Sequence, residues 1–299
     1  MSEWIRESYR ALRASVTEGL AKLALTALQD GSVPKHIAFV MDGNRRHADR
    51  HGEKPIRGHI SGYDTLLDVL QWCRKLQVST VSVYAFSIDN YTRSEEEVSL
   101  LMKLVEEKLG ELEGEAPRLR REGVRVRVLG DLSLAPPGAR EAARRVMEAT
   151  AGNDTCTLNI FFSYTASEEL VRAGKRLACA EHLGTTGQHL DDHLYTSEEV
   201  DLLIRTSGES RLSDFMLRQS RCCVLHFTET LWPDFGLVDL LEAVMVYQRH
   251  AARLEEVRDV LARAKTESLA VYSRRNRRRK EEAGTRSPSS VLSVDEDCG

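Results

Sequence analysis

The sequence predicts an α/β protein with a six-stranded, mostly parallel sheet flanked by helices. Two observations lead to this fold class: six short runs rich in β-branched and apolar residues recur along the chain, and segments with helical periodicity separate them. Strands that alternate with helices are typical of βαβ units, in which helices cover both faces of a parallel sheet. Ligands of such sheets bind beyond the carboxyl ends of the strands, so the residues that follow each run are the candidate site.

The composition is that of a globular protein with a full hydrophobic core. Of the 299 residues, 41% are hydrophobic and 29% are charged, and the formal net charge is -4. This charge gives no global basic field, so we expect no nucleic acid among the partners. The six cysteines show no zinc-ligand spacing, no apolar run approaches the roughly 20 residues of a membrane span, and the first residues do not resemble a signal peptide. We therefore expect the chain to stay on the cytosolic side.

The chain is predicted to have three parts. Residues 1–33 are an N-terminal segment in which residues 3–29 carry apolar side chains in steps of three and four, which predicts an amphipathic helix. The favoured interpretation docks this helix on the body of the protein, and the alternative places it on a membrane surface. Residues 34–270 form the main domain, and residues 271–299 are expected to be a disordered tail, first basic and then acidic. The basic block 274–280 is either a solvated helix end or a contact for anionic lipid or a partner.

The strands and helices follow from short apolar runs and from longer periodic ones. Strands are predicted, in chain order, at residues 37–41, 80–86, 124–130, 156–162, 201–206 and 224–228. Their length and β-branched content favour strands over helices. Helices are predicted over 63–76 and 94–123, and one or two more over 235–270.

The first strand ends in the sequence Asp42-Gly43-Asn44-Arg45-Arg46. A glycine lets the backbone approach a ligand, and two arginines beside the N–H groups of a following helix suit a phosphate. A carboxylate among them is explained if it holds Mg²⁺, which proteins bind through one or two carboxylates plus substrate phosphates. For this stretch alone, a salt-bridged strand end is a nearly equal alternative.

Other strand ends carry polar side chains of the same kind. They are Ser87, Asn90 and Arg93 after the second strand, Arg205, Arg211 and Ser213 at the end of the fifth, and His59 within the triplet 57–59. Five arginines at one rim would repel one another unless a highly charged anion lies between them, and two diphosphates fit that need better than one phosphate. The sequence lacks a P-loop, a GxGxxG after the first strand and the kinase motifs, and Asn44 stands where an aspartyl-phosphate phosphohydrolase needs a second acid.

Six sequence blocks carry a resemblance to a known family. In chain order they are HIAFVMDGNRRHA, GHISGY, YAFSIDNYTRSEEEV, RVLGDL, LLIRTSGESRLSDFML and FTETLWPDF, over about residues 34–250. They resemble the signature blocks of the cis-prenyltransferase (undecaprenyl diphosphate synthase) family, and within it the eukaryotic dehydrodolichyl diphosphate synthase catalytic subunits. The resemblance implies a dimer with an apolar tunnel. It also implies elongation of farnesyl diphosphate by isopentenyl diphosphate units, with cis geometry, into a long-chain product for dolichol synthesis and protein glycosylation.

The resemblance also implies roles for the strand-end residues. Asp42 would be catalytic and bind Mg²⁺, and Asn90 would orient a diphosphate or assist proton removal, for which a neutral amide is a poor base. The substrate-binding residues would be Gly43, Asn44, Arg45, Arg46, His59, Ser87 and Arg93 around the allylic diphosphate, and Arg205, Arg211 and Ser213 for the isopentenyl diphosphate. The 94–123 helix, with Val98, Leu101, Leu104 and Leu109, is a candidate wall of the tunnel, although these side chains fit an ordinary core equally well.

Several positions depart from the family pattern. Pro55 stands where an arginine is usual, with Arg57 as a nearby substitute, and Val224 stands where bacterial members have a metal-binding glutamate. Arg45 and His47 replace a glycine and a tryptophan of the bacterial block, and the Arg-x-Gly that completes the site in homomeric members is missing near the C-terminus.

These departures lead to an expected partner. We expect a heteromer in which a Nogo-B-receptor-like, non-catalytic subunit supplies Arg-x-Gly, bound peripherally to the cytosolic face of the endoplasmic reticulum membrane. The alternatives are a homomeric medium-chain enzyme and a non-catalytic interaction subunit of the same fold.

Overall fold

The computed structural model describes residues 25–26, 28–182 and 190–284. The helix predicted over residues 1–33 therefore lies almost entirely outside the described residues. Its described end contributes Leu25, which is buried in the core.

The sheet has the six predicted strands, all parallel. They are β1 (His36–Val40), β2 (Thr80–Ser87), β3 (Val124–Leu129), β4 (Cys156–Tyr164), β5 (Leu202–Arg205) and β6 (Val224–Phe227), and each overlaps a predicted run. Their order across the sheet is β3-β4-β2-β1-β5-β6. Strands β2, β4 and β3 therefore lie on one side of β1, and the later strands β5 and β6 lie on its other side. This reversal makes a topological switch point beside β1, where ligands of open α/β sheets bind.

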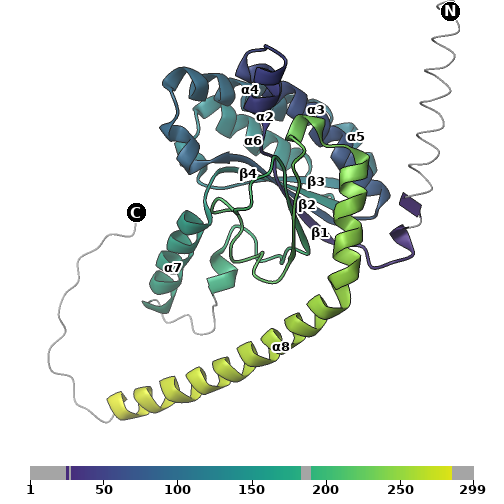
Figure 1. The fold of residues 1–299 in the computed structure, drawn as a ribbon. Helices are drawn as coiled ribbons and strands as arrows, with labels where there is room; N and C mark the ends of the chain where they lie inside the picture. The colour runs from purple at the N-terminus through teal and green to yellow at the C-terminus, as the bar shows by residue number, and fades with distance from the viewer. Residues whose placement is uncertain (1–24, 27, 183–189, 285–299) are drawn as a thin grey trace, which may run out of the picture.

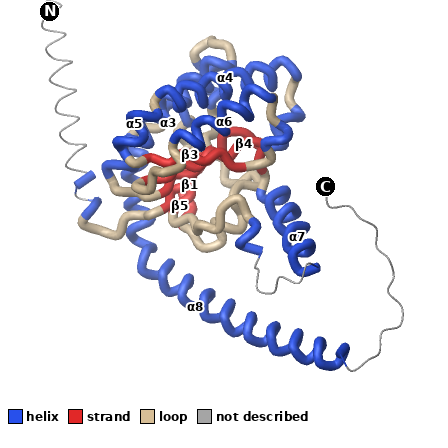
Figure 2. Tube along the Cα trace, turned by 180° about the vertical axis from the view of Figure 1, so that it is seen from behind, coloured by secondary structure: helices blue, strands red, loops and turns tan. Residues whose placement is uncertain are grey.

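Both faces of the sheet are covered, as its apolar strands require. The helices are α2 (Asn44–Arg50), α3 (Pro55–Lys75), α4 (Glu95–Gly114), α5 (Ala116–Glu122), α6 (Pro137–Ala149), α7 (Ala166–His182) and α8 (Leu237–Gly284). Figures 1 and 2 show α3 to α6 on one side of the sheet and α7 on the other. In β1, Ile37 and Phe39 point into the core on the α3 side, whereas Ala38 and Val40 point into the core on the opposite side. A strand that is buried on both faces consists of consecutive apolar residues, and this is why the position of β1 could be predicted from the sequence.

The helix predicted over residues 94–123 is two helices. It is interrupted at Glu115, between α4 and α5. Pro117 accounts for the break, because proline has no N–H for a helix interior and its ring clashes with the carbonyl of the preceding turn. Gly114, a poor helix former, lies next to the break.

The C-terminal helix is longer than predicted. Helix α8 has 48 residues and continues to Gly284, so residues 271–284, which we expected to be disordered, are helical. Between residues 271 and 283 the sequence has neither proline nor glycine and is rich in arginine, lysine and glutamate, which are good helix formers. Figure 1 shows α8 leaving the body and running beneath it. Within the described parts of the chain, no helix is both long and apolar enough to cross a bilayer.

Candidate active site

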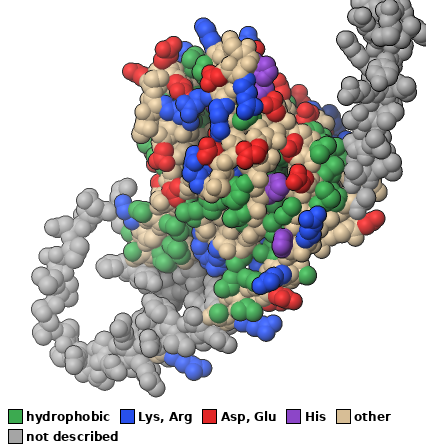
Figure 3. Space-filling view, in the orientation of Figure 1, with side chains coloured by type: hydrophobic (Ala, Val, Ile, Leu, Met, Phe, Trp, Pro, Cys, Tyr) green, Lys and Arg blue, Asp and Glu red, His purple; other side chains and the backbone are tan. Residues whose placement is uncertain are grey.

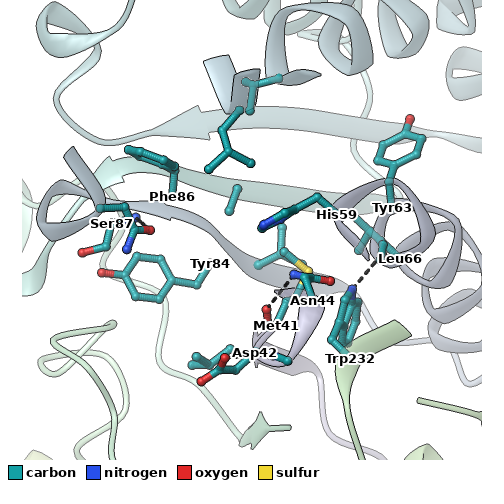
Figure 4. A pocket seen from close by; sticks show the side chains of 18 of the residues that line it. Met41, Asp42, Asn44, His59, Tyr63, Leu66, Tyr84, Phe86, Ser87 and Trp232 are labelled. Carbon is teal, nitrogen blue, oxygen red and sulfur yellow. Dashed lines mark hydrogen bonds between the residues drawn. The ribbon is translucent and has the colours of Figure 1, made fainter. Parts of the chain in front are cut away.

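All twelve predicted site residues line one cavity of about 890 Å³. They are Asp42, Gly43, Asn44, Arg45, Arg46, His59, Ser87, Asn90, Arg93, Arg205, Arg211 and Ser213. Figure 4 shows Asp42, Ser87 and His59 arranged around this cavity, each coming from a different part of the chain. The cavity lies at the carboxyl ends of β1, β2 and β5, as the topology predicts.

The pairing of β1 with β5 brings Asp42 and Arg205 together. Val40 is in register with Arg205, so the residues that follow β1 meet the end of β5. Arg205 is 3% exposed, and its Nη2 donates a hydrogen bond to Asp42 Oδ2 over 3.0 Å. Thr206 fixes the backbone of the same turn, because its hydroxyl accepts the Asp42 N–H at 3.0 Å and donates to the Asp42 carbonyl at 2.7 Å. Sequence reasoning did not identify Thr206.

Gly43 has the backbone conformation that only glycine adopts easily. Its φ is 108°, and its N–H donates to Asp42 Oδ1 over 2.7 Å. A Cβ at this position would also lie 3.0 Å from Leu231 Cβ. The turn therefore folds the Asp42 carboxylate back over the start of α2, with Arg45 and Arg46 on the first turn of that helix.

The arginines of the cavity are paired with more acids than the sequence indicated. Arg93 Nη1 donates to Glu97 over 2.9 Å, and Arg45 approaches the same carboxylate at 3.8 Å. On the opposite side, Arg46 lies 3.6 Å from Glu209, which also accepts a hydrogen bond from Arg211.

The five arginines therefore face three carboxylates, those of Asp42, Glu97 and Glu209. The two missed glutamates lie within the quoted blocks, and the i,i+4 spacing of Arg93 and Glu97 was a signal that could have identified one of these pairs. The arginines that line the cavity still favour an anionic ligand.

The loop after β5 is held in an unusual conformation. Ser207, Ser213, Asp214 and Met216 all have positive φ, between 47° and 76°. Such conformations cost free energy in residues other than glycine and persist only where surrounding contacts fix them. Here Arg205 Nη1 donates to Ser213 Oγ over 2.7 Å and to a backbone carbonyl of the same loop. The buried guanidinium thus positions Ser213 at the cavity.

Ser87 and Asn90 form a capping box at the end of β2. The Ser87 hydroxyl accepts the Asp89 N–H at 3.1 Å, and Asn90 Oδ1 accepts the Ser87 N–H at 3.1 Å. The amide oxygen of Asn90 is therefore occupied, and its NH₂ group is the part that can donate to a ligand. This geometry suits a residue that orients an anion and does not suit a base.

His59 is a neutral, partly buried histidine that lines the cavity. Burial, together with the positive charge of Arg93, lowers its pKa to about 4. Its Nε2 and the Asn44 side-chain oxygen are buried without a hydrogen-bond partner among the described residues. Figure 4 shows both side chains at the cavity. Two unsatisfied polar atoms in one cavity indicate that a ligand or water completes their bonding.

Two close packing contacts position α2. A Cβ on Gly58 would lie 1.9 Å from the Asn44 carbonyl oxygen, so only glycine lets α2 and α3 approach this closely. The indole of Trp232 donates to the Gly62 carbonyl over 2.7 Å, and the Trp232 N–H donates to the Asp42 carbonyl over 2.9 Å. Sequence reasoning assigned no role to either glycine or to Trp232.

The rest of the cavity is apolar. Its lining includes Leu66 and Leu70 of α3, Val83 of β2, and Leu158 and Ile160 of β4. On α4, Leu101, Leu104 and Leu109 line it as expected, whereas Val98 does not and instead packs against the core. A charged mouth therefore leads into an apolar chamber, which suits a ligand with an anionic head and a hydrocarbon tail.

The structure also shows where the positions that depart from the family pattern lie relative to the cavity. Pro55 lines the cavity at the start of α3, but Arg57 is exposed and does not, so Arg57 does not take the place of the usual arginine. Val224 is 9% exposed in the core at the beginning of β6, at the opposite end of the sheet from the carboxyl edge that carries Asp42. It does not line the cavity.

The residues fit Mg²⁺ only if substrate supplies most of its ligands. Asp42 presents a carboxylate that is 34% exposed at the mouth. Over the described residues, no group of three or more His, Cys, Asp or Glu side chains could hold a metal by itself. Mg²⁺ keeps several waters and is commonly bound by one or two carboxylates plus phosphate oxygens, so a single carboxylate is sufficient for that mode.

Comparison with known proteins agrees with this geometry. Residues 40–255 match the prenyltransferase family model of undecaprenyl diphosphate synthase. The chain is 38% identical over 267 residues to a dehydrodolichyl diphosphate synthase complex subunit of Mus musculus, covering 87% of this chain and 78% of the mouse protein. It is 39% identical over 235 residues to an isoprenyl transferase of Halalkalibacterium halodurans, covering 76% and 91%.

Solved structures show the same fold. Lavandulyl diphosphate synthase from Lavandula x intermedia, in complex with dimethylallyl diphosphate, superposes with a TM-score of 0.68 at 28% identity, over 72% of this chain and 95% of that one. A probable undecaprenyl diphosphate synthase from Campylobacter jejuni gives a TM-score of 0.60 at 28% identity, with the same coverage. From these matches and the cavity that its strand ends form, the chain belongs to the undecaprenyl diphosphate synthase family of cis-prenyltransferases.

Proposed function

We propose that the chain elongates farnesyl diphosphate with isopentenyl diphosphate, in cis geometry, to a long-chain dehydrodolichyl diphosphate used for dolichol synthesis and protein glycosylation. The observation that carries this proposal is the single cavity, in which five arginines surround a mouth that opens into an apolar chamber. The names of relatives support the product class, since the mouse and tomato proteins are dehydrodolichyl diphosphate synthases or subunits of that complex.

Shared glutamates link the arginines of the mouth in pairs, and Arg46 joins the start of α2 to the loop after β5. Arg45 and Arg93 share Glu97 on one side of the mouth, and Arg46 and Arg211 share Glu209 on the other. Arg205 lies with Asp42 and Ser213, at the end of β5. We assign the allylic diphosphate to the start of α2 and the isopentenyl diphosphate to the β5 loop.

The chemistry follows from the charge that develops. As the bond from C1 of the allylic substrate to its diphosphate breaks, negative charge grows on the leaving group. Fixed guanidinium groups and backbone N–H groups stabilise it without reorganising. Mg²⁺, when bound through Asp42 and the phosphates, would neutralise part of the same charge. Asn90 would hold a diphosphate through its NH₂ group, and the apolar chamber would keep water from the electron-deficient carbon.

The fold also favours a partner subunit. Strand β6 is an edge strand, and it exposes Leu225 at 44% and Phe227 at 37%. Val238 and Met245 of α8 are exposed at 77% and 42%. An exposed apolar edge strand is a site for association. We assign this surface to a non-catalytic subunit of the Nogo-B-receptor type that supplies Arg-x-Gly, in keeping with the complex-subunit names of the mouse and human relatives.

The long apolar product suggests a membrane surface. We place the heteromer on the cytosolic face of the endoplasmic reticulum, bound peripherally. Hydrophobic side chains gather in the lower half of the face drawn in Figure 3, with Lys and Arg side chains among them. The basic block 274–280 on α8 would attract anionic lipid.

Incubation with farnesyl diphosphate, labelled isopentenyl diphosphate and Mg²⁺, with and without the partner, tests the proposal. We expect long-chain labelled product from the complex and little from the chain alone. Full turnover by the chain alone would favour a homomeric medium-chain enzyme. No product under either condition would favour a non-catalytic subunit, which the intact Asp42 and arginine set opposes.

A further inference from the structure

The loop after β5 reaches across the sheet. Strands β1 and β2 separate β5 from β4, yet Phe215 of this loop is fully buried against residues of β4 on the α7 side. Its ring meets those of Phe161 and Tyr164 edge to face, with centroids 5.2 and 6.1 Å apart. Ser213, two residues earlier, therefore lies near strands with which β5 does not pair.

Tyr84 of β2 contacts this loop with both its ring and its hydroxyl. The ring stacks on that of Phe215, with centroids 4.5 Å apart and 12° between the two planes. The hydroxyl donates to the Tyr164 carbonyl over 3.0 Å and has the Ser213 carbonyl as a second acceptor at 3.4 Å. One side chain of β2 thus joins the end of β4 to the loop after β5.

The Tyr84 hydroxyl remains a donor. Burial, together with the nearby carboxylates of Asp214 and Asp89, raises the pKa of Tyr84, so the phenol is protonated at neutral pH. Both acceptors are backbone carbonyls, which cannot donate in return. A phenylalanine in this place would keep the ring but leave the two carbonyls without this donor.

Ser213 is held through its side chain and through its backbone. Arg205 donates to its hydroxyl over 2.7 Å, and Tyr84 reaches its carbonyl. The backbone has a φ of 49° at Ser213 and 56° at Asp214, and Asp214 accepts the Ala166 N–H at the start of α7 over 2.8 Å. Such conformations persist only where surrounding contacts fix them. Arg205 and Tyr84 supply two of these contacts from the wall of the cavity.

The start of α2 is positioned by different contacts. Trp232 bonds the Asp42 carbonyl, and Gly58 allows α2 to pack closely on α3. Within the part of the chain that the structure describes, the Tyr84 hydroxyl bonds β4 and the loop after β5 and not α2. A change at Tyr84 should therefore affect the loop after β5 and spare the start of α2.

We propose that Tyr84 is a positioning residue for the isopentenyl diphosphate, because its ring and hydroxyl fix the loop that presents Arg211 and Ser213 to the cavity. This inference rests on the proposed prenyl transfer and on the assignment of that diphosphate to the loop after β5. Tyr84 acts through Ser213 and takes no part in the bond-forming step. Figure 4 shows its side chain at the cavity, between those of Ser87 and Asp42.

Tyr84→Phe tests the role of the hydroxyl and keeps the stacked ring. In the full complex, initial rates of the first addition are measured while either isopentenyl diphosphate or farnesyl diphosphate is varied. We expect the KM for isopentenyl diphosphate to rise about 3–10-fold, as the loss of one neutral hydrogen bond implies. The KM for farnesyl diphosphate and kcat should stay within about twofold of the wild type, which general damage to the fold would not allow.

Tyr195→Phe is the matched control. Tyr195 is also a partly buried tyrosine that packs against Tyr164, and its hydroxyl donates to Glu168 at 3.3 Å, but it does not line the cavity. Both KM values of this variant should equal those of the wild type.

Amide hydrogen exchange gives a readout that does not depend on turnover. In the Tyr84→Phe complex, peptides that cover residues 207–216 should exchange faster than in the wild type, because the loop has lost one of the contacts that fix it. Peptides of α2 should exchange at the wild-type rate.

The outcomes separate this inference from the proposed function. An unchanged KM for isopentenyl diphosphate, an equal rise in both KM values, or unchanged exchange of residues 207–216 would overturn the role of Tyr84 and leave prenyl transfer standing. If the wild-type complex incorporates no isopentenyl unit, the proposed function fails, and the assignment of Tyr84 to this substrate fails with it.

Discussion

Two aspartate–arginine pairs lie at opposite ends of the same strands, and they differ in their surroundings. At the amino ends, Arg258 of α8 donates to Asp201 over 2.6 Å, and the other Asp201 oxygen accepts the backbone N–H groups of Lys35 and His36. At the carboxyl ends, Arg205 and Asp42 are joined over 3.0 Å, and both line the cavity. The Asp42 side chain is 34% exposed, against 9% for Asp201.

The difference separates a structural pair from a functional one. The Asp201 carboxylate is enclosed and fully bonded, and Arg258 also donates to the Val200 and Cys222 carbonyls, so the pair fastens α8 to β5 and β6. The Asp42 carboxylate faces a cavity and can accept a further ligand. Both pairs join an aspartate to an arginine. Their roles differ because the Asp201 oxygens are already fully hydrogen-bonded, whereas the Asp42 carboxylate can accept a further ligand.

Neutralising Asp42 should have the largest effect on activity. Asp42→Asn keeps the shape but removes the charge that would bind Mg²⁺ and hold Arg205, so we expect kcat/KM to fall by about 10²–10³-fold. The free energy of unfolding should fall by about 1–2 kcal/mol, because the buried Arg205 loses its counter-charge but keeps a neutral amide oxygen as acceptor. Steady-state kinetics and urea unfolding measure the two effects, and a large loss of stability with near-normal turnover would reverse the assignment.

Asp201→Ala should show the opposite pattern. It leaves Arg258, the buried His36 N–H and the part-buried Lys35 N–H without their acceptor, so we expect a loss of about 3 kcal/mol in unfolding free energy. Turnover per folded molecule should stay near the wild-type value. An Asp201→Ala protein as stable as Asp42→Asn would show that the enclosed pair does not hold the sheet and α8 together.

Gly58→Ala tests how the functional pair is kept in place. The added methyl would meet the backbone oxygen of Asn44, which cannot turn away as a side chain can, so we expect a cost of about 1–3 kcal/mol and a raised KM for the allylic diphosphate. Gly110→Ala on α4 is the control, because its Cβ would meet nothing within 4 Å and it should stabilise by about 0.5–1 kcal/mol. If Gly58→Ala and Gly110→Ala had the same effect on stability in calorimetry and on the KM for the allylic diphosphate, the packing explanation would be excluded.

The pH dependence of stability sharpens the comparison between His36 and His59. Burial lowers the pKa of both, but each His36 ring nitrogen has a partner, Ser82 or the Glu199 carbonyl, whereas His59 Nε2 has none. The folded pKa of His59 is about 4 and its unfolded value is 6.5, so between these values the unfolded chain binds the extra proton and stability falls as the pH drops.

From pH 7.5 to about 5.5 this effect should cost about 1.4 kcal/mol in the free energy of unfolding. His59→Asn should remove that part of the dependence and leave the contribution of His36. Urea unfolding of both proteins at the two pH values measures it. If the wild type and His59→Asn lost the same unfolding free energy over this pH range, the pH dependence could not be assigned to His59.

The sequence by itself determined the strands and the residues at their carboxyl ends. A parallel strand buried on both faces must be an apolar run, so its ends are visible without coordinates, and strands that are parallel deliver those ends to one edge. This is why Asp42, Ser87 and Arg205 could be placed together in advance. The break before Pro117 was also visible in the sequence but was overlooked.

Only the tertiary structure decided which charges meet and which backbones touch. Glu97 and Glu209 each have a partner close in sequence, Arg93 and Arg211. Their second partners, Arg45 and Arg46, come from a distant segment and depend on how α2 packs against the ends of β2 and β5. Likewise, Gly58 matters because α2 happens to approach α3 within the radius of a methyl group. Pairing and close approach depend on distances between elements far apart in the chain, and a one-dimensional pattern carries no such distances.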